Sequence, residues 1–237
     1  MTNELLVVAV VALMATAILS ATYFGKPFLF AISCFIIVVS NATVGIQLDV
    51  FGLAVSWGVI VYSFIYLITD ILSELFEEDS AYQLAFMNVF VQVVFWIYLT
   101  LTFFVETRVS QETLSTLEQL YATTPRITLA ALVAVFGAFV DIWVYEKIKK
   151  RYSGSQSVWS GLWFRNNVST IVGQSVNTVL FFTIALWGVV PDLLSIILTA
   201  IAIKAAIALV DTPLLYAAKT VFEMRGAGSQ ARKPASV

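Results

Sequence analysis

The sequence contains no histidine and only one cysteine, Cys34, in 237 residues. Without histidine the chain cannot form a Ser-His-Asp triad, and a single cysteine permits neither an internal disulfide nor a Cys/His zinc site. The G-x-x-x-x-G-K-[ST] motif of P-loop nucleotidases is absent as well. We therefore expect neither an enzyme nor a resident cofactor or metal ion. The formal net charge of −2 gives no indication of a nucleic-acid partner.

Charged residues are also scarce. They make up 12% of the chain, against about 25% in soluble domains, whereas hydrophobic residues make up 60%. Long apolar runs recur along the whole length, so the sequence predicts an all-α, polytopic helix bundle in the lipid bilayer. Seven spanning helices are expected: Leu5–Tyr23, Phe28–Gln47, Gly52–Thr69, Leu84–Val105, Ile127–Tyr145, Val168–Val190 and Leu193–Val221.

The sequence also allows predictions for the two ends of the chain and for one long loop. The first run follows Met-Thr-Asn-Glu and has no basic start, which favours an uncleaved helix over a signal peptide. Thr107–Thr124 is polar and is expected to form a loop with room for a short surface helix. After Arg225 the residues are small and polar, which predicts a disordered tail.

Basic residues predict the orientation of the helices, because clusters of lysine and arginine favour the cytoplasmic side. Two such clusters flank the last two spans, so both can be cytoplasmic, and counting back places the amino terminus outside. The acidic 77–79 loop then lies in the cytoplasm without a basic residue of its own. The clusters are Lys147, Lys149, Lys150, Arg151 and Arg165, and then Lys219, Arg225, Arg232 and Lys233.

The sixth span carries a polar stripe in an otherwise apolar helix. Asn167, Thr170, Gln174 and Asn177 follow one another at spacings of 3, 4 and 3, which places them on one helix face. Amide and hydroxyl groups are costly in hydrocarbon unless they are hydrogen-bonded. We expect this helix to begin after Arg165 and its stripe to face a polar ligand, a polar partner helix or water. Our working hypothesis is a wet, ligand-sized chamber.

Charged residues are predicted at membrane depth in three spans. Asp70 and Glu74 end the third span on a shared face, Asp141 lies late in the fifth, and Lys204 and Asp211 lie two turns apart in the last. A charge at mid-bilayer costs roughly 2.5–3.5 kcal/mol on insertion scales, so such residues are usually paired or functional. For Lys204, both an ion pair with a carboxylate of another helix and a role in substrate or proton coupling are open. Asp141 is expected to be structural, because it lies near an interface beside basic residues.

Two further segments interrupt the apolar pattern. Asn41 belongs to a small polar cluster, Ser40–Thr43, which is either a helix-packing surface or part of a site. Pro213 predicts a kink in the last span, since proline removes one backbone hydrogen bond. Asp211, two residues earlier, either satisfies the freed backbone groups or faces a cavity.

Four ordered motifs carry a family resemblance. They are Thr69–Glu74 (T-D-x-x-S-E), Thr124–Arg126 with the later Gly137 and Asp141, Arg165–Thr170 (R-N-N-x-S-T) followed by Gly173, Gln174 and Thr178, and Lys204 with Asp211–Pro213 and Tyr216. Together they resemble the signature of the vitamin uptake transporter, or queuosine precursor transporter, family, from about Phe28 to Val221. The chain departs from that signature at several polar positions, including Asn177, where the family has aspartate, and Ala138, where it has glutamine.

The resemblance implies a six-helix core at residues 26–222 that carries 7-deazaguanine compounds, precursors of the tRNA nucleoside queuosine, across the cytoplasmic membrane of a prokaryote. Residues 1–25 would add one amino-terminal helix, and residues 223–237 a disordered cytoplasmic tail. A deazaguanine edge offers N–H and NH2 donors beside a carbonyl acceptor. A carboxylate such as Asp70 or Glu74 would accept from the donors, while Arg165 or an amide would donate to the carbonyl. The candidate substrate-binding residues are Asn41, Asp70, Glu74, Arg165, Asn166, Asn167, Thr170, Gln174, Asn177, Lys204 and Asp211.

Three other functions stay open from the sequence. The chain has the size of a substrate-binding subunit of an energy-coupling-factor system, which would bring an ATPase partner, and homo-oligomers are equally open. An intramembrane enzyme is disfavoured by the missing histidine and nucleophile–base pair. A structural membrane protein would use the polar stripe only to pack helices, and ligand-induced thermal stabilisation distinguishes it from a transporter.

Overall fold

The computed structural model describes residues 2–43, 46–50, 52–102, 124–152, 158–188 and 192–231. Within this part of the chain, seven stretches of helix are long and apolar enough to cross a membrane, so the predicted all-α polytopic fold is confirmed. The elements are α1 (Asn3–Phe24), α2 (Lys26–Thr43), β1 (Gln47–Val50), β2 (Leu53–Ser56), α3 (Trp57–Leu75), α4 (Glu78–Thr102), α6 (Thr124–Ala134), α7 (Phe136–Tyr152), α8 (Val158–Leu186) and α9 (Leu193–Ala231).

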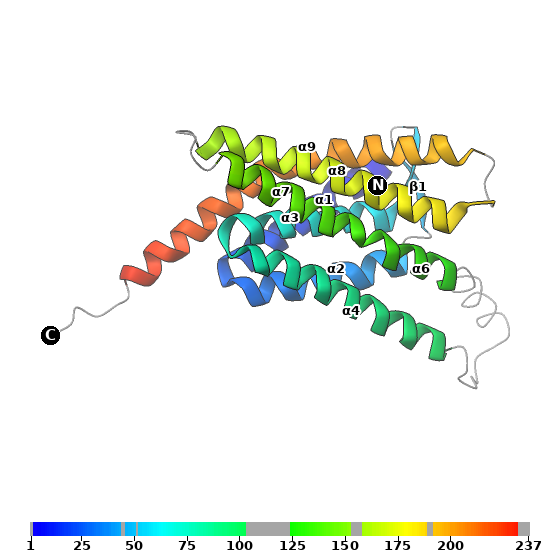
Figure 1. Ribbon diagram of the computed structural model, residues 1–237, viewed down its shortest axis with the longest axis horizontal. Coiled ribbons are helices and arrows are strands. Elements are labelled where there is room, and N and C mark those ends of the chain that lie inside the picture. The colour runs from blue at the N-terminus through cyan, green and yellow to red at the C-terminus, as the bar shows by residue number, and fades with distance from the viewer. Residues whose placement is uncertain are drawn as a thin grey trace.

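The helices pack side by side into one elongated bundle (Figure 1). Helix α3 lies at its centre, since 78% of its spanning window is buried, compared with 22% for α1 and for α4. It packs against α1, α2, α4, α7, α8 and α9. Because other helices surround α3, its polar side chains, among them Thr69 and Asp70, lie inside the bundle and not on a lipid-facing surface.

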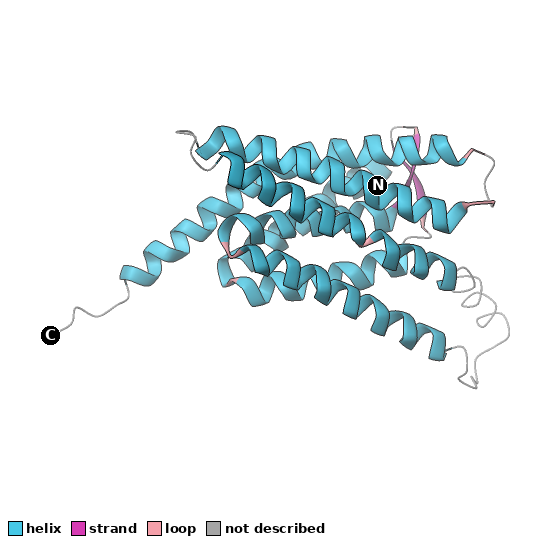
Figure 2. Ribbon diagram, in the orientation of Figure 1, coloured by secondary structure: helices cyan, strands magenta, loops and turns pink. Residues whose placement is uncertain are grey.

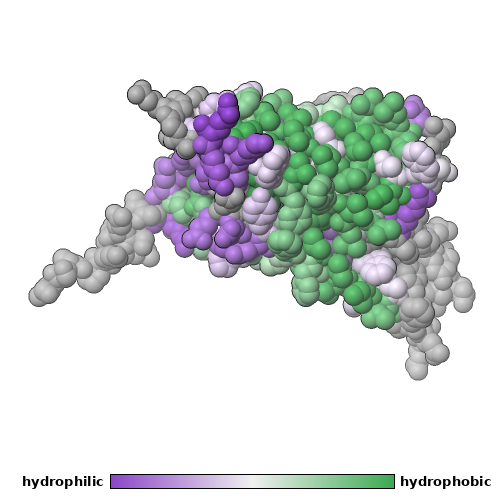
Figure 3. Space-filling model, in the orientation of Figure 1, coloured by the Kyte–Doolittle hydropathy of each residue, from purple (hydrophilic) through white to green (hydrophobic). Residues whose placement is uncertain are grey.

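The outer surface is apolar where lipid is expected. Leu13, Phe86, Phe90 and Leu198 are each more than half exposed on the sides of the bundle. In Figure 3 hydrophobic residues cover the middle of the molecule, and hydrophilic residues gather at one end. This distribution is typical of a protein whose helices are surrounded by hydrocarbon.

A short β-hairpin marks one end of the bundle, which we call the hairpin end (Figure 2). Strands β1 and β2 pair antiparallel from Gln47 with Ser56 to Val50 with Leu53. Gly52 has φ +77° in the turn, a left-handed conformation that favours glycine. Asn3 Nδ2 donates to the Asp49 carbonyl at 2.8 Å, so α1 begins at the same end.

The opposite end carries most of the described lysine and arginine residues, and we call it the basic end. Lys26 Nζ donates to Gln83 Oε1 at 3.0 Å, which places the start of α2 beside α4. Lys149 donates to the Ser73 carbonyl near the carboxyl end of α3, where a cation also interacts favourably with the helix dipole. The acidic segment 77–79, at the junction of α3 and α4, therefore lies at the same end of the bundle as these lysines.

Several predicted boundaries differ from the structure. The second and third spans were expected to reach Gln47 and to begin at Gly52, but residues 47–50 and 53–56 form the hairpin. Helix α3 runs on to Leu75 and contains both of its carboxylates. Helix α8 begins at Val158, seven residues before Arg165. Arg165 and Asn166, whose polar side chains suggested a helix start there, are hydrogen-bonded inside the bundle.

Three other predicted segments also differ from the structure. Helix α9 continues to Ala231, so the tail expected to be disordered from residue 223 is helical up to that point, while residues 232–237 lie outside the described residues. Pro213 lies inside α9. Leu215 and Ala218 beyond it are still buried, and only the last turns of the helix point away from the bundle (Figure 1). The expected polar loop lies outside the described residues, except that Thr124 already begins α6.

Candidate functional site

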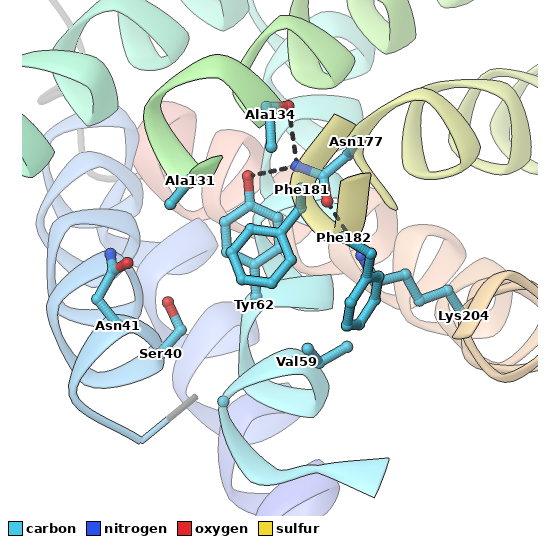
Figure 4. A pocket seen from close by; sticks show the side chains of 11 residues that line it. Ser40, Asn41, Val59, Tyr62, Ala131, Ala134, Asn177, Phe181, Phe182 and Lys204 are labelled. Carbon is cyan, nitrogen blue, oxygen red and sulfur yellow. Dashed lines mark hydrogen bonds between the residues drawn. The ribbon is translucent and has the colours of Figure 1, made fainter. Parts of the chain in front are cut away.

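A pocket lies between α2, α3, α6, α8 and α9 (Figure 4). The space in it that admits water-sized molecules is about 40 Å³, less than the roughly 300–1,000 Å³ of a small-molecule site. Most of its wall is apolar or aromatic, with a few polar side chains. The lining residues are Ser40, Asn41, Gly58, Val59, Tyr62, Ala131, Ala134, Asn177, Phe181, Phe182 and Lys204.

Asn177 joins three helices at the inner side of this pocket. Its Nδ2 donates to the Tyr62 hydroxyl at 3.2 Å and to the Ala134 carbonyl at 2.9 Å, and its Oδ1 accepts from Lys204 Nζ at 3.0 Å. Figure 4 shows these bonds converging on Asn177 from α3, α6 and α9. An amide can hold this position because it donates and accepts at once, which a carboxylate cannot.

Lys204 is the one charged residue among those that line the pocket. Lys204 is 3% exposed, and its Nζ lies 5.7 Å from the centre of the Tyr62 ring. The sequence left open an ion pair between Lys204 and a carboxylate of another helix. Among the described residues no such pair occurs, and Lys204 Nζ instead donates to the amide oxygen of Asn177. A buried ammonium group in a membrane protein thus has a neutral partner and an adjoining cavity.

The remaining pocket walls combine rings with small polar groups. Figure 4 places the Tyr62, Phe181 and Phe182 rings on the α3 and α8 side and Ser40 and Asn41 across from them. Asn41 Nδ2 donates to the Ile37 carbonyl at 2.8 Å, and its Oδ1 accepts from Gln92 of α4 at 3.4 Å. Flat aromatic surface with few oriented polar atoms is suited to a planar heterocycle.

A second cavity of about 440 Å³, a size within the range of small-molecule sites, adjoins the first toward the hairpin end. The two cavities share Val59 and Phe182 in their linings. The second one also contacts Gln47 and Ser56 of the hairpin and the first turns of α9 at Ser195. A ligand entering from the hairpin end would therefore pass through this wider cavity to reach Lys204.

Deeper in the bundle, the polar stripe of α8 contacts neighbouring helices. Thr170 Oγ1 donates to Asp70 Oδ2 of α3 at 3.0 Å, and Asn167 Nδ2 donates to Thr212 Oγ1 of α9 at 2.8 Å. Asn166 Nδ2 reaches the same hydroxyl at 3.2 Å. Gln174 differs: it is 2% exposed, and neither of its amide atoms has a hydrogen-bond partner among the described residues.

Helices α7 and α8 cross closely beside this stripe. A Cβ atom on Gly137 would lie 2.5 Å from the Gly173 carbonyl oxygen, and one on Gly173 would lie 2.4 Å from the Asp141 Cβ. This approach brings Asp141 into the protein interior, where Oδ2 accepts from Thr69 Oγ1 at 3.3 Å. Asp141 thus bonds to a hydroxyl of another helix, whereas Lys147 lies 4.5 Å from the Trp143 ring centre.

An ion cluster lies beyond the stripe toward the basic end. Arg165 donates to Glu74, whose carboxylate also accepts from the Tyr145 hydroxyl at 3.1 Å and lies 3.5 Å from Lys219 Nζ. The Glu74 side chain is 6% exposed and that of Arg165 is 9% exposed. Charged groups from α3, α8 and α9 therefore fill the bundle at this level, and they separate the pocket from the basic end.

Two comparisons with known proteins show the family of the chain. A family model described as "Putative vitamin uptake transporter" matches residues 56–218. A curated protein named "Probable queuosine precursor transporter" from Bacillus subtilis (strain 168) is 32% identical over 205 residues, which cover 83% of this chain and 85% of that protein. The chain belongs to the vitamin uptake transporter family. No solved structure matches it.

Membership of the family confirms the resemblance that the four motifs predict, and the structure distributes the candidate residues over three levels of this transporter. Asn41, Asn177 and Lys204 line the pocket. The middle level holds Asp70, Asn166, Asn167, Thr170, Gln174 and Asp211, and Glu74 and Arg165 form the ion cluster. Of the four stripe residues, the two cavities described above contact Asn177 alone. The role of each residue in binding stays a prediction.

Sequence reasoning did not single out the aromatic residues of the pocket. Tyr62, Phe181 and Phe182 lie in apolar helices that also carry many lipid-facing rings, so composition does not separate them. One usable signal exists for the last pair: Phe181 follows Asn177 at a spacing of four and so continues the face of the polar stripe. Thr212, which accepts from two asparagines, was noted only as part of a kink.

Proposed function

We propose that the chain imports queuosine precursors of the 7-deazaguanine type across the cytoplasmic membrane of a prokaryote. The observation that carries the proposal is the hydrogen-bonded pair of Lys204 and Asn177 at the inner side of a pocket inside the bundle, next to a wider cavity of about 440 Å³ that leads toward the hairpin end. The name of the Bacillus subtilis relative supports the substrate class. Family membership supports transport over catalysis.

The distribution of charge supports an orientation for this transporter. Lys26, Lys149, Lys219 and Arg225 belong to the basic end, which the positive-inside rule assigns to the cytoplasm. The hairpin end, and with it the wider cavity, is then outside the cell. In this orientation the pocket faces the external solution, and the ion cluster around Glu74 closes the cytoplasmic side.

The pocket offers the partners that a deazaguanine needs. Lys204 Nζ has donors left after its bond to Asn177 and can donate to the ring carbonyl. Oxygen atoms of Ser40 and Asn41, on the opposite wall, can accept from the ring N–H and NH2 groups. The heterocycle would stack against Tyr62 and Phe182. Micromolar binding needs about −8 kcal/mol, which several hydrogen bonds and a buried ring can supply.

In this arrangement Asp70 and Glu74 are not the first acceptors of the substrate. Their carboxylates are bonded to Thr170 and to Arg165 in the structure. We place them, together with Gln174 and Asn167, on the route between the pocket and the cytoplasm, which opens only when the helices around it separate.

The test is uptake of a labelled 7-deazaguanine by the purified chain in liposomes, together with uptake in a strain that lacks its own importer and synthesis. Asn177→Ala should reduce uptake at least ten-fold, because it removes the partner that holds Lys204 and Tyr62 in place. Val179→Ala, on the lipid-facing side of the same helix, should transport like the wild type.

Three outcomes would decide against the proposal in different ways. No uptake and no thermal stabilisation by any 7-deazaguanine would refute the substrate class. Uptake that appears only when a co-purified ATPase is present would assign the chain to an energy-coupling-factor system. Unchanged uptake by Asn177→Ala would remove the pocket from the transport path.

A further inference from the structure

Two carboxylates, which we call the carboxylate pair, lie near each other deep in the bundle. Asp70 of α3 and Asp141 of α7 are 2% and 0% exposed and interact electrostatically. Their hydrogen-bond partners are neutral: Thr170 Oγ1 donates to Asp70 Oδ2 at 3.0 Å, and Thr69 Oγ1 donates to Asp141 Oδ2 at 3.3 Å. The Oδ1 atom of each carboxylate is buried and has no hydrogen bond of good geometry among the described residues. Each carboxylate therefore has one oxygen atom free to hold a proton.

The groups around the pair do not neutralise it. Asp211 of α9 adds a third carboxylate within electrostatic range of Asp70, and the Tyr145 hydroxyl of α7 lies in range as well. Arg165 of α8 is the cation in that range, but it donates to Glu74, one turn further along α3. Helices α1, α2, α4 and α6 also pack on α3 or α7, and within the described ranges none of their charged residues is buried. Like charges at short range in a dry interior favour a shared proton.

A buried tyrosine connects the carboxylate pair with the pocket. Tyr66 of α3 is 0% exposed, and its hydroxyl interacts electrostatically with both the Asp141 carboxylate and the Tyr62 hydroxyl. It makes a hydrogen bond of good geometry to neither group. Tyr62, whose ring centre lies 6.1 Å from that of Tyr66, lines the pocket and accepts from Asn177. Because a tyrosine hydroxyl both donates and accepts, this row can pass a proton from the pocket to Asp141.

The pair also lies beside the close crossing of α7 and α8. A Cβ atom on Gly173 would lie 2.4 Å from the Asp141 Cβ, so α8 covers Asp141 directly. Ionisation of both carboxylates would push α3 and α7 apart, whereas one bound proton lets the two helices stay packed. Gain or loss of a proton therefore shifts the balance between this packing and a separated arrangement of the same helices.

We propose that the carboxylate pair binds one proton and that the entry of this proton together with the substrate drives import. The inference rests on the proposed function and adds its energy source. The proton enters from the external side by way of Tyr62 and Tyr66, binds to an Oδ1 atom of the pair, and leaves to the cytoplasm when α3, α7 and α8 separate. Ionised Asp70 then competes with Glu74 for Arg165, which favours the separated state.

The experiment uses the purified full chain in liposomes with the membrane potential clamped and a labelled 7-deazaguanine as the probe. Accumulation is measured under a pH difference of one unit, alkaline inside, and counterflow exchange is measured at equal pH. For the wild type, one proton per substrate gives about ten-fold accumulation, since both gradients then amount to about 1.4 kcal/mol. Asp141→Asn keeps the shape of the side chain but cannot take up a proton, so it should lose the accumulation and keep wild-type counterflow. The exposed Glu77→Gln should change neither.

Tyr66→Phe provides a second variant, because it leaves both carboxylates in place and removes only the connecting hydroxyl. It should slow pH-driven accumulation at least ten-fold and keep wild-type counterflow. A wild type that shows counterflow but no pH-driven accumulation, or that accumulates only under a sodium gradient, would overturn the inference and leave the proposed function intact. Undiminished accumulation by Asp141→Asn, or by Tyr66→Phe if the first variant does not fold, would also overturn it. Absence of counterflow in the wild type would instead refute the proposed function.

Discussion

Gln174 provides a test of whether the polar stripe of α8 exists for stability or for the substrate. Its amide is 2% exposed, and neither its oxygen nor its nitrogen is hydrogen-bonded within the described residues. A buried polar group left without a partner costs about 1–3 kcal/mol. The isosteric change Gln174→Met removes both groups without opening a cavity, so we expect the free energy of unfolding to rise by about 1–3 kcal/mol.

Asn167 is the matched control, because it lies on the same face of the same helix, two turns earlier. Its Nδ2 donates to Thr212 Oγ1 at 2.8 Å and to the Trp163 carbonyl at 2.8 Å. Asn167→Leu keeps the shape of the side chain but loses both bonds and leaves Thr212 without one of its donors. We therefore expect this variant to be less stable than the wild type by about 1–3 kcal/mol, the opposite sign from Gln174→Met.

The assay is thermal unfolding of both variants in detergent, followed by uptake in liposomes. For a chain of this size, 1 kcal/mol corresponds to about 2–4 °C in Tm. Gln174→Met should unfold at a higher temperature than the wild type yet transport at least ten-fold more slowly, since the amide on the proposed route, three residues from Asn177, can then no longer bond to a passing substrate. A less stable Gln174→Met with normal transport would refute this reasoning and make the residue structural.

Two further predictions concern helix packing and the ion cluster. Gly137→Ala should lower the free energy of unfolding by about 1–3 kcal/mol through overpacking at the crossing of α7 and α8, whereas Gly161→Ala, whose added Cβ would meet nothing closer than 3.5 Å, should be neutral or stabilising in the same thermal assay. Glu74→Gln should destabilise the protein by about 3–5 kcal/mol, because two cations lose their counter-ion, while the exposed Glu77→Gln should change stability by less than about 0.5 kcal/mol; equal Tm values for the two glutamate variants would contradict the cluster.

The number and type of the helices could be predicted from the sequence because hydrocarbon imposes one dominant requirement, long apolar runs. The same signal fails at element ends. Residues 47–50 alternate polar and apolar side chains and are followed by Gly52, which is a hairpin signal. The apolar residues on either side made this segment look like the ends of two spanning helices. Similarly, hydropathy predicted the start of α8 too late. Arg165 and Asn166 lower the hydropathy of this segment, although their side chains are hydrogen-bonded to residues of other helices.

The partners of charged residues could be predicted less well than their positions. Lys204 was expected at membrane depth and Asp141 near an interface beside basic residues. In the structure both are buried and bond to neutral groups, an asparagine amide and a threonine hydroxyl. Sequence gives no direct measure of which side chain faces another across two helices. The close crossing at Gly137 and Gly173 decides which groups meet Asp141, and that crossing depends on backbone geometry.

The surroundings of the polar stripe change at Gln174, and this change shows what a spacing pattern can and cannot predict. Thr170 meets Asp70 and Asn167 meets Thr212, so in this half the groups facing the stripe are protein. Toward the hairpin end no side chain of a neighbouring helix bonds to Gln174 within the described residues, and Asn177 borders a cavity. Polar residues at spacings of 3, 4 and 3 indicate that the whole helix face has polar surroundings. Whether a given residue makes a packing contact or a ligand contact depends on whether the opposing helix carries a matching polar residue.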